Sequence, residues 1–300
     1  MQRQKALTFC VLTLFFLCPS ADGVSIDELS KTVVFLRQQS PVTYPQGDKE
    51  VPVFYLDPNT KKYEPLMKTI CGTGLIVNYN KRDYIITAKH VAKELSPTAE
   101  VIMNRPAYKS RSVTFEWLSK QKIIRGARWF PHPKADIAVH PMAYAEQVEL
   151  LAIDQNDCPK KDVEPPLLAP AYILGFPLGL GVHDTLSPVA KGTRIASRIT
   201  SVDIRGVSPD LKFILLDEAS AQGYSGSPVF YTEDIMSPKM RIAGQPVKQG
   251  EKVHFVGVVS ATIPDSTGGK ITLVVPISYV WDIFEGPNFR AYERALESGK

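Results

Sequence analysis

The sequence predicts an all-β protein built in two halves, and three observations support this prediction. Short runs of β-branched and apolar residues recur along the chain with turn residues between them, which is typical of strands. The 24 prolines and 19 glycines are spread along the chain, which favours many short elements over a few long helices. Proline and charge are dense between Asp154 and Pro170, which indicates a linker between two halves.

The chain begins with a pattern typical of an export signal. Arg3 and Lys5 form a basic region, residues 6–18 are uncharged and mostly apolar, and small residues follow up to Gly23. The apolar run is too short to span a bilayer comfortably, so we expect cleavage after Ala21 or Gly23 and no stable membrane anchor afterwards. The mature protein is therefore expected outside the cytoplasm, secreted or in a periplasm.

Composition limits the partners that we expect. A formal charge of +4 on 300 residues argues against binding to nucleic acid. The chain has no CxxC pair and no HExxH motif, so we expect neither a metal nor another cofactor. Removal of the signal leaves Cys71 and Cys158, and the sequence leaves open whether they form a disulfide.

Residues 24–155 form the first predicted domain. Its strands are expected near residues 33–36, 74–77, 84–87, 101–103, 113–115 and 137–139. A polar turn joins the second and third of these strands in a hairpin. The polar stretch from Gln38 to Lys68 is interpreted as a long surface loop, either a spacer or a partner-binding insertion.

A linker over 156–169 and a second domain over 170–276 follow. The expected strands lie near residues 172–174, 194–202, 213–216, 253–259 and 271–275. The remaining residues, 277–300, are predicted to hold a C-terminal helix and tail. Helix is indicated because four apolar residues fall on one helical face: Tyr279, Val280, Ile283 and Phe284.

Ser225 lies in a Gly-x-Ser-Gly-Ser-Pro segment that suits a nucleophile. A serine hydroxyl attacks a carbonyl only when a base takes its proton, and the resulting oxyanion needs preorganised donors. Glycines on both sides of Ser225 let the backbone turn tightly, so that N–H groups point at one spot. We expect the N–H groups of Gly223 and Ser225 to form this oxyanion hole.

His90 and Asp136 are the expected partners of Ser225. His90 follows an apolar run, and an imidazole moves protons well near neutral pH. Asp136 opens another apolar run, where a buried carboxylate needs a partner such as an imidazole N–H. A carboxylate in that place holds the imidazole tautomer and stabilises the imidazolium.

These residues and their surroundings resemble the chymotrypsin-like serine peptidases. The order His, Asp, Ser is that of this family. The local matches are Thr-Ala-x-His ending at His90, Asp-Ile-Ala-Val starting at Asp136, Gly-x-Ser-Gly-Ser-Pro at 223–228 and Gly-Val-Val-Ser at 257–260. Gly-Phe-Pro-Leu-Gly at 175–179 resembles the corresponding segment of bacterial and HtrA-like members.

The resemblance covers residues 31–286 and implies both a fold and an activity. The implied fold is two six-stranded antiparallel β-barrels with a C-terminal helix. The implied activity is that of a serine endopeptidase, which hydrolyses proteins or peptides through an acyl-enzyme and needs no cofactor.

Two departures from the family bear on specificity. Ala219 stands where trypsin carries an aspartate, and Val259 stands where glutamyl endopeptidases carry a histidine. Cleavage after Arg, Lys or Glu is therefore not expected. The resemblance implies an uncharged pocket for a small or medium uncharged side chain, lined by Ala219, Ser220, Ser260 and Thr262.

Two alternatives remain. An α/β-hydrolase would use Ser225, Asp234 and His254 in that order, but Ser227 stands where its nucleophile turn needs glycine, and no alternation of strands and helices precedes Ser225. The other alternative is a protease fold retained as a non-catalytic binding module. A binding protein has no physical need for all three triad groups.

Overall fold

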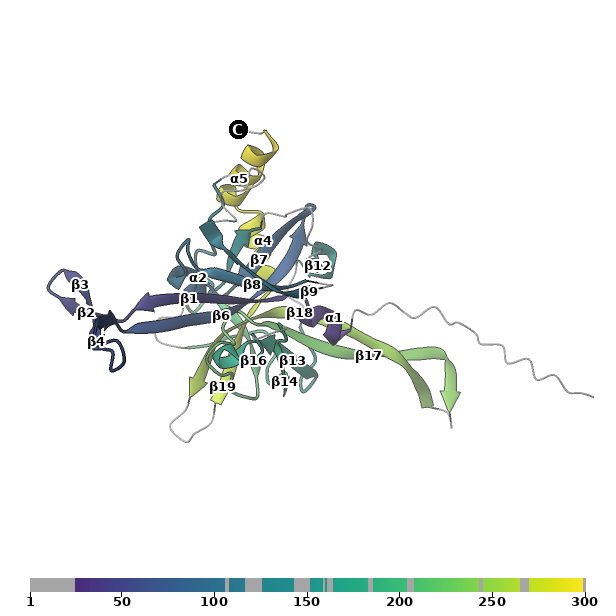
Figure 1. Ribbon diagram of the computed structural model, residues 1–300. Helices are drawn as coiled ribbons and strands as arrows, with labels where there is room; N and C mark the ends of the chain where they lie inside the picture. Colours follow the sequence, from purple (N-terminus) through teal and green to yellow (C-terminus); the bar gives the residue numbers. More distant parts are fainter. Residues whose placement is uncertain are drawn as a thin grey trace, which may run out of the picture.

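Two β-sheets and a pair of C-terminal helices make up the body of the chain (Figure 1). This computed structural model describes residues 25–105, 108–116, 126–142, 152–158, 160, 164–182, 186–203, 208–242, 245–264 and 270–298. The export signal expected at residues 1–23 lies outside this part. Among the helices in these ranges, none is long and apolar enough to cross a membrane.

The first sheet has eight strands in the order β10-β11-β7-β6-β1-β8-β9, with β12 parallel to β6. They are β1 (Val33–Pro41), β6 (Met67–Tyr79), β7 (Arg82–Thr87), β8 (Glu100–Arg105), β9 (Tyr108–Thr114), β10 (Phe130–Pro131), β11 (Ala138–Pro141) and β12 (Ile153–Asp154). Helix α1 (Ile26–Ser30) precedes β1, and a capping box between Ser25 and Glu28 begins it. Helix α2 (Lys89–Glu94) follows β7 directly.

The second sheet has seven strands in the order β14-β13-β17-β18-β19-β16-β15. They are β13 (Pro170–Gly175), β14 (Val189–Arg194), β15 (Thr200–Ser201), β16 (Lys212–Leu216), β17 (Pro228–Ile242), β18 (Gln245–Pro264) and β19 (Lys270–Pro276). Strands β17 and β18 pair as a long ribbon that extends well beyond the body (Figure 1). Two 3-10 helices complete the description: η2 (Gln155–Asp157) follows β12, and η3 (Pro177–Gly179) follows β13.

The strand count differs from the expected six in each half. The first sheet gains the short strands β10 and β12, of two residues each. In the described ranges no ladder joins the two ends of either sheet, so the sheets curl without closing into barrels. The fold is thus mostly β with two largely antiparallel sheets, consistent with the double-barrel expectation at this coarser level.

The strand expected over 194–202 is wrong in most of its length. Arg194 ends β14, Ile195 forms a single bridge to Leu216, and only β15 is extended beyond it. The Ser197 hydroxyl accepts a hydrogen bond from Leu215 N at 3.0 Å. This side-chain bond takes the place of a ladder bond, so the segment bends where the apolar pattern predicts a continuous strand.

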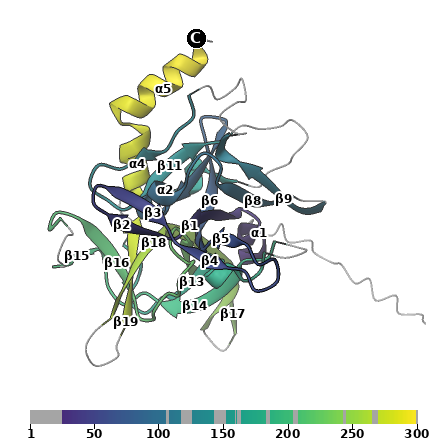
Figure 2. The same ribbon diagram turned by 60° about the vertical axis from the view of Figure 1, so that its left-hand side comes forward.

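Residues 38–68 are not the surface loop that the sequence predicts. Between paired ends of β1 and β6, two hairpins project from the body: β2 (Thr43–Gln46) with β3 (Lys49–Pro52), and β4 (Phe54–Leu56) with β5 (Tyr63–Pro65). We call residues 42–66 the arm, which comes forward in Figure 2. Its strands are largely exposed, three of the four contain proline, and the apolar β4 is only three residues long, so none shows the apolar alternation that identifies a half-buried strand.

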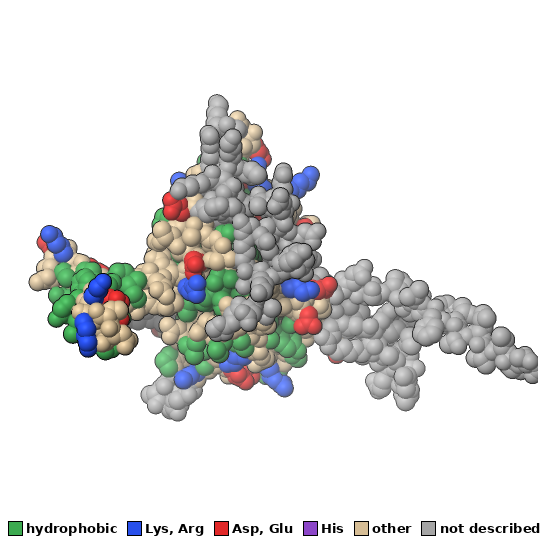
Figure 3. Space-filling view, in the orientation of Figure 1, with side chains coloured by type: hydrophobic (Ala, Val, Ile, Leu, Met, Phe, Trp, Pro, Cys, Tyr) green, Lys and Arg blue, Asp and Glu red, His purple; other side chains and the backbone are tan. Residues whose placement is uncertain are grey.

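One face of the arm is apolar. Phe54 pairs with Pro65 and Leu56 pairs with Tyr63, so these side chains share a face of the β4–β5 hairpin. Phe54, Leu56 and Tyr63 are 54%, 51% and 75% exposed. Figure 3 shows hydrophobic and lysine side chains gathered on this projection.

The C-terminal segment forms two helices where one is predicted. Helix α4 (Ser278–Phe284) ends before Gly286, and α5 (Pro287–Glu297) begins at Pro287. Proline lacks the N–H that would continue the helix and is favoured in a first turn. Val280, Ile283 and Phe284 are buried, as the apolar face predicts.

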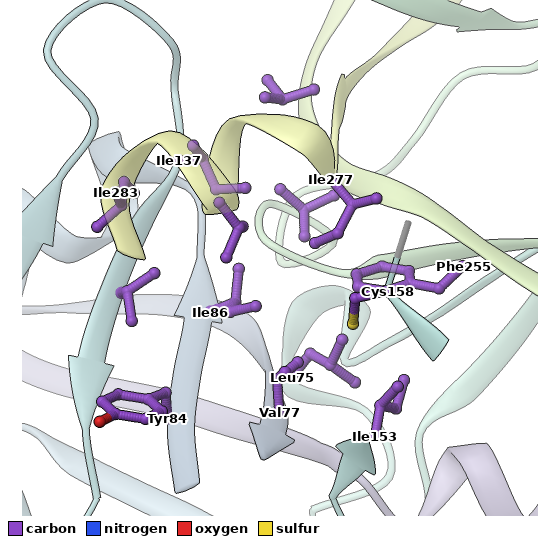
Figure 4. Packing of buried hydrophobic residues seen from close by; sticks show 14 of the residues in the cluster. Leu75, Val77, Tyr84, Ile86, Ile137, Ile153, Cys158, Phe255, Ile277 and Ile283 are labelled. Carbon is purple, nitrogen blue, oxygen red and sulfur yellow. The ribbon is translucent and has the colours of Figure 1, made fainter. Parts of the chain in front are cut away.

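A continuous apolar core joins the two sheets to the helices. Figure 4 shows Leu75, Ile86, Phe255, Ile277 and Ile283 packed together from both sheets and from the segment around α4. Two smaller clusters fill the individual sheets. The strands at the seam therefore hold a fixed position relative to each other, which the candidate site requires.

Cys71 and Cys158 are both thiols in the structure, so the disulfide left open by the sequence is not formed. Cys158 is buried in the core cluster, and half-buried Cys71 packs against the same cluster. Burial raises the pKa of the Cys71 thiol, which lowers its reactivity.

Candidate active site

Ser225 lies in the turn before β17, against the first sheet. Gly223 and Gly226 on either side have φ values of +97° and +82°, which glycine adopts without steric cost. A Cβ on Gly226 would collide with Thr73 O and Thr87 Oγ1 and would lie 3.0 Å from Ala88 N. The glycine therefore lets the Ser225 turn come into contact with the segment that precedes His90.

His90 and Asp136 are joined by two hydrogen bonds. His90 lies in the first turn of α2, and its Nδ1 lies 2.8 Å from Asp136 Oδ2. The His90 backbone N–H donates to Asp136 Oδ1, also at 2.8 Å. With Nδ1 donating to the carboxylate, Nε2 is left as a proton acceptor, on a side chain that is 50% exposed.

The Ser260 hydroxyl also donates to Asp136 Oδ2, at 2.6 Å. Burial by itself raises the pKa of Asp136, but the hydrogen bonds and charge of His90, together with the Ser260 bond, outweigh burial. The pKa of Asp136 therefore lies below its ordinary value, and the group is a carboxylate at neutral pH. The sequence predicts Ser260 as a pocket residue, but its hydroxyl faces the carboxylate.

The turn that presents Asp136 is itself held by side chains. His132 Nδ1 accepts from Ala135 N at 2.7 Å and from Lys134 N at 3.2 Å. Burial lowers the pKa of His132 despite the nearby Asp282, so Nδ1 stays an acceptor near neutral pH. Lys89, next to His90, donates to His132 O at 2.9 Å. These bonds tie the Asp136 turn to the start of α2.

The backbone of Ser225 lies against β6 near the start of α2. Thr73 N donates to Ser225 O at 2.9 Å, and a Cβ on Gly72 would lie 2.5 Å from Val91 Cγ1 and 3.4 Å from Ser225 O. The backbone of Gly72 thus lies between the Ser225 carbonyl and the side chain of Val91, the residue after His90. Within the described chain, the Ser225 hydroxyl makes no hydrogen bond to the imidazole; such bonds often tighten only when substrate is bound.

The backbone around Ser225 leaves two N–H groups unused. Gln222 O accepts from Leu178 N at 2.8 Å, and Tyr224 O accepts from Ser227 N at 2.8 Å. In a trans peptide the N–H points opposite to the C=O, so these bonds fix the directions of the next N–H groups, those of Gly223 and Ser225. Among described residues, neither N–H has an acceptor, which is what an oxyanion hole requires.

The remaining predicted pocket residues lie beside this turn. Ser220 Oγ and Thr262 Oγ1 are 2.6 Å apart, and Ser220 N also lies 3.2 Å from Thr262 Oγ1. Ala219 is half-buried, and its carbonyl accepts a hydrogen bond from Lys191, which also pairs with Glu218 at 3.2 Å. Lys191 is therefore bound to the Ala219 carbonyl and to the Glu218 carboxylate.

The groups of the α/β-hydrolase alternative lie elsewhere. His254 Nε2 lies 3.1 Å from Glu233 Oε2, and its ring stacks on Tyr231 with centroids 4.6 Å apart. This pair belongs to the β17–β18 ribbon beyond the Ser225 turn. No group of three or more metal-ligating side chains occurs in the described ranges.

Two largely antiparallel sheets followed by C-terminal helices are consistent with a trypsin-like protease fold. The chain is similar over most of its length to the HtrA-type protease AlgW, whose structure was determined with a decapeptide: 16% identity over 87% of this chain and 66% of that one, with a TM-score of 0.51. The chain thus spans less than two thirds of that structure. No protein-family model and no curated protein matches the sequence.

Other solved structures of the same class are similar as well. Deg5 is 15% identical over 85% of this chain and 88% of its own, with a TM-score of 0.48. The MamO protease domain from Magnetospirillum magneticum is 15% identical over 85% of this chain and 96% of its own, with a TM-score of 0.47. At 16% identity the likeness to AlgW shows the fold alone, that of an HtrA-type, trypsin-like serine protease domain.

Proposed function

We propose that this chain is a serine endopeptidase that uses Ser225, His90 and Asp136 as its catalytic triad. Two observations support the proposal best: the His90–Asp136 hydrogen bond of 2.8 Å, and the turn at Ser225, in which the N–H groups of Gly223 and Ser225 have no acceptor among the described residues. An imidazole oriented by a carboxylate and a preorganised pair of donors are the two parts that acyl transfer needs.

In this mechanism His90 Nε2 takes the proton from Ser225 Oγ as the oxygen attacks the scissile carbonyl. The N–H groups of Gly223 and Ser225 stabilise the oxyanion. His90 then gives its proton to the leaving amine, which leaves an acyl-enzyme on Ser225. Water attacks the acyl-enzyme with His90 again as the base, and Ser225 is restored.

Substrates are proposed to be proteins or peptides with a small or medium uncharged side chain before the cleaved bond. The AlgW structure contains a decapeptide, which is a property of that protein and motivates peptides as substrates here. The Ser220–Thr262 hydrogen bond joins two predicted pocket residues and narrows the space between them. A peptide library cleaved mainly after Arg, Lys or Glu would contradict this specificity.

Labelling with a fluorophosphonate tests the activity. The wild-type protein should be labelled at Ser225, and Ser225→Ala should not be. Asp136→Asn should lower turnover by about 10⁴-fold, because the imidazole then adopts the wrong tautomer. A wild-type protein that neither reacts nor cleaves peptides would instead favour the non-catalytic binding module.

We also propose that the protein acts outside the cytoplasm, since residues 1–23 read as an export signal. N-terminal sequencing of the protein from the culture medium or periplasm tests this. The expected first residue follows Ala21 or Gly23; an intact start in the cytoplasm would contradict the proposal.

A further inference from the structure

Thr73 makes three hydrogen bonds across the seam between the sheets and a fourth within the first sheet. It lies in β6 of the first sheet and is fully buried. Its N–H donates to Ser225 O at 2.9 Å, and its hydroxyl donates to Gly223 O at 2.8 Å. The same hydroxyl accepts from Phe176 N at 3.1 Å, and Thr73 O accepts from Thr87 Oγ1 at 2.7 Å.

The bond to Gly223 matters because glycine rotates freely. Gly223 has φ +97°, and its two flanking peptides turn about one Cα atom without steric hindrance from a Cβ. The peptide before it is held through Gln222 O by Leu178 N, and the peptide after it is held through Gly223 O by Thr73 Oγ1. The same peptide also donates from Tyr224 N to Ala221 O, at 3.2 Å, so removal of the Thr73 bond leaves this side of Gly223 held by that longer bond alone.

Thr73 also connects the turn to the segment that carries the proposed base. Thr87, which donates to Thr73 O, lies three residues before His90 at the end of β7. The Ser225 carbonyl and the Thr87 hydroxyl therefore bind the N–H and the C=O of the same residue, Thr73. A shift of Thr73 would move the nucleophile relative to the histidine.

We infer that Thr73 is a positioning residue of the active site: its hydroxyl holds the carbonyl of Gly223, and with it the Gly223–Tyr224 peptide, so that the turn between the Gly223 and Ser225 N–H groups keeps both aimed at the oxyanion. This inference depends on the proposed function for its catalytic meaning. Its structural part, the restraint of the 222–227 turn, stands on the hydrogen bonds alone. Thr73 bonds the backbone carbonyls of Gly223 and Ser225 rather than the Ser225 hydroxyl, so it acts through the turn.

Thr73→Val tests the inference because valine keeps the shape and both backbone bonds and loses only the hydroxyl. Loss of a whole oxyanion donor lowers kcat by about 10²–10³-fold, so a donor left mobile should cost about 10–100-fold in kcat with little change in KM. Thr73→Ser keeps the hydroxyl and should retain most of kcat. The matched control is Thr32→Val, since the buried Thr32 hydroxyl donates to Leu29 O at 2.7 Å at the end of α1.

Hydrogen–deuterium exchange gives a readout that does not depend on activity. In Thr73→Val the amides of Tyr224, Gly226 and Ser227 should exchange faster than in the wild type, and in Thr32→Val and Thr73→Ser they should not. Equal kcat and equal exchange in Thr73→Val and Thr32→Val would overturn the inference. A wild-type protein without peptidase activity would refute the proposed function, and the exchange comparison would then decide the positioning role by itself.

Discussion

The hydroxyl of Ser260 and Nδ1 of His90 bind the same oxygen, Asp136 Oδ2, at 2.6 Å and 2.8 Å. Ser260 comes from β18 of the second sheet, whereas Asp136 precedes β11 of the first. The carboxylate is therefore held from both sheets, and its orientation depends on how they are packed together.

Ser260→Ala should lower kcat by about tenfold, which corresponds to about 1.4 kcal/mol in the barrier, and leave KM nearly unchanged. The carboxylate would then lose the donor that fixes Oδ2. Hydrolysis of a fluorogenic peptide measures this, and Ser260→Thr, which keeps a hydroxyl, is the control. Full kcat in Ser260→Ala would show that His90 alone orients Asp136.

Gly226→Ala should unfold or inactivate the protein. Alanine at φ +82° is strained by about 1–2 kcal/mol, and its Cβ would also collide with the Thr73 carbonyl. Gly47→Ala is the matched control, because Gly47 has φ +62° and open space around it. In urea unfolding, Gly226→Ala should lower the free energy of unfolding by at least about 2 kcal/mol more than Gly47→Ala does. Equal losses would mean that the seam relaxes around the methyl group.

Ser220→Gly should broaden specificity toward larger side chains. It removes the hydroxyl that lies 2.6 Å from Thr262 Oγ1 and so separates the two predicted pocket residues. The ratio of kcat/KM for a Phe substrate to that for an Ala substrate should rise by about tenfold, or about 1.4 kcal/mol. An unchanged ratio would place the selective side chain elsewhere.

Glu293 on α5 anchors the C-terminal helices to the first sheet. Its carboxylate accepts from Tyr84 OH at 2.5 Å and from Arg82 Nη1 at 3.0 Å. Burial, together with the bond to Glu293, raises the pKa of Tyr84, so this hydroxyl stays a donor. Glu293→Ala should cost about 2–3 kcal/mol in the free energy of unfolding, less than for a wholly buried pair because Arg82 is partly exposed. Glu297→Ala, an exposed position on the same helix, should cost under about 0.5 kcal/mol.

His140 should make the fold sensitive to acid. Burial among Phe115 and Trp129 lowers the pKa of His140 to about 4. Between about pH 6.5, where an unfolded histidine titrates, and pH 4, the unfolded chain binds the extra proton. This contribution to stability is present above about pH 6.5 and is lost as pH falls through that window, by about 3 kcal/mol in all.

The measurement is urea unfolding of the wild type and of His140→Phe at pH 7, 5.5 and 4.5. Phenylalanine keeps a ring against its aromatic neighbours and cannot titrate. The difference between the two proteins should therefore shrink or reverse as the pH falls. Parallel pH dependences would mean that other groups account for the acid sensitivity.

Local motifs explain why much of the candidate site could be predicted from the sequence. The segments around His90, Asp136 and Ser225 are each recognisable from a few neighbouring residues. The roles predicted for His90 and Asp136 require them to be in contact, and they are hydrogen-bonded. Most apolar runs also became strands, since their residues are buried on the sheet faces.

Contacts between distant residues could not be predicted in the same way. Thr73 and Gly223 are 150 residues apart, and nothing local to either residue indicates their hydrogen bond. The family resemblance places Ser260 in the pocket through the strand that carries it, whereas the direction of its hydroxyl is set by the packing of the sheets. The arm strands carry no such signal in the sequence, because their side chains are exposed or only partly buried.

The arm leaves the first sheet and returns to it at a single rung, where Pro41 lies opposite Met67. Because the two ends of the arm lie next to each other, the insertion does not interrupt the pairing of β1 with β6. Its length and composition are thus free to vary independently of the catalytic body, and a short turn that joined Pro41 to Met67 would restore a plain hairpin of β1 and β6.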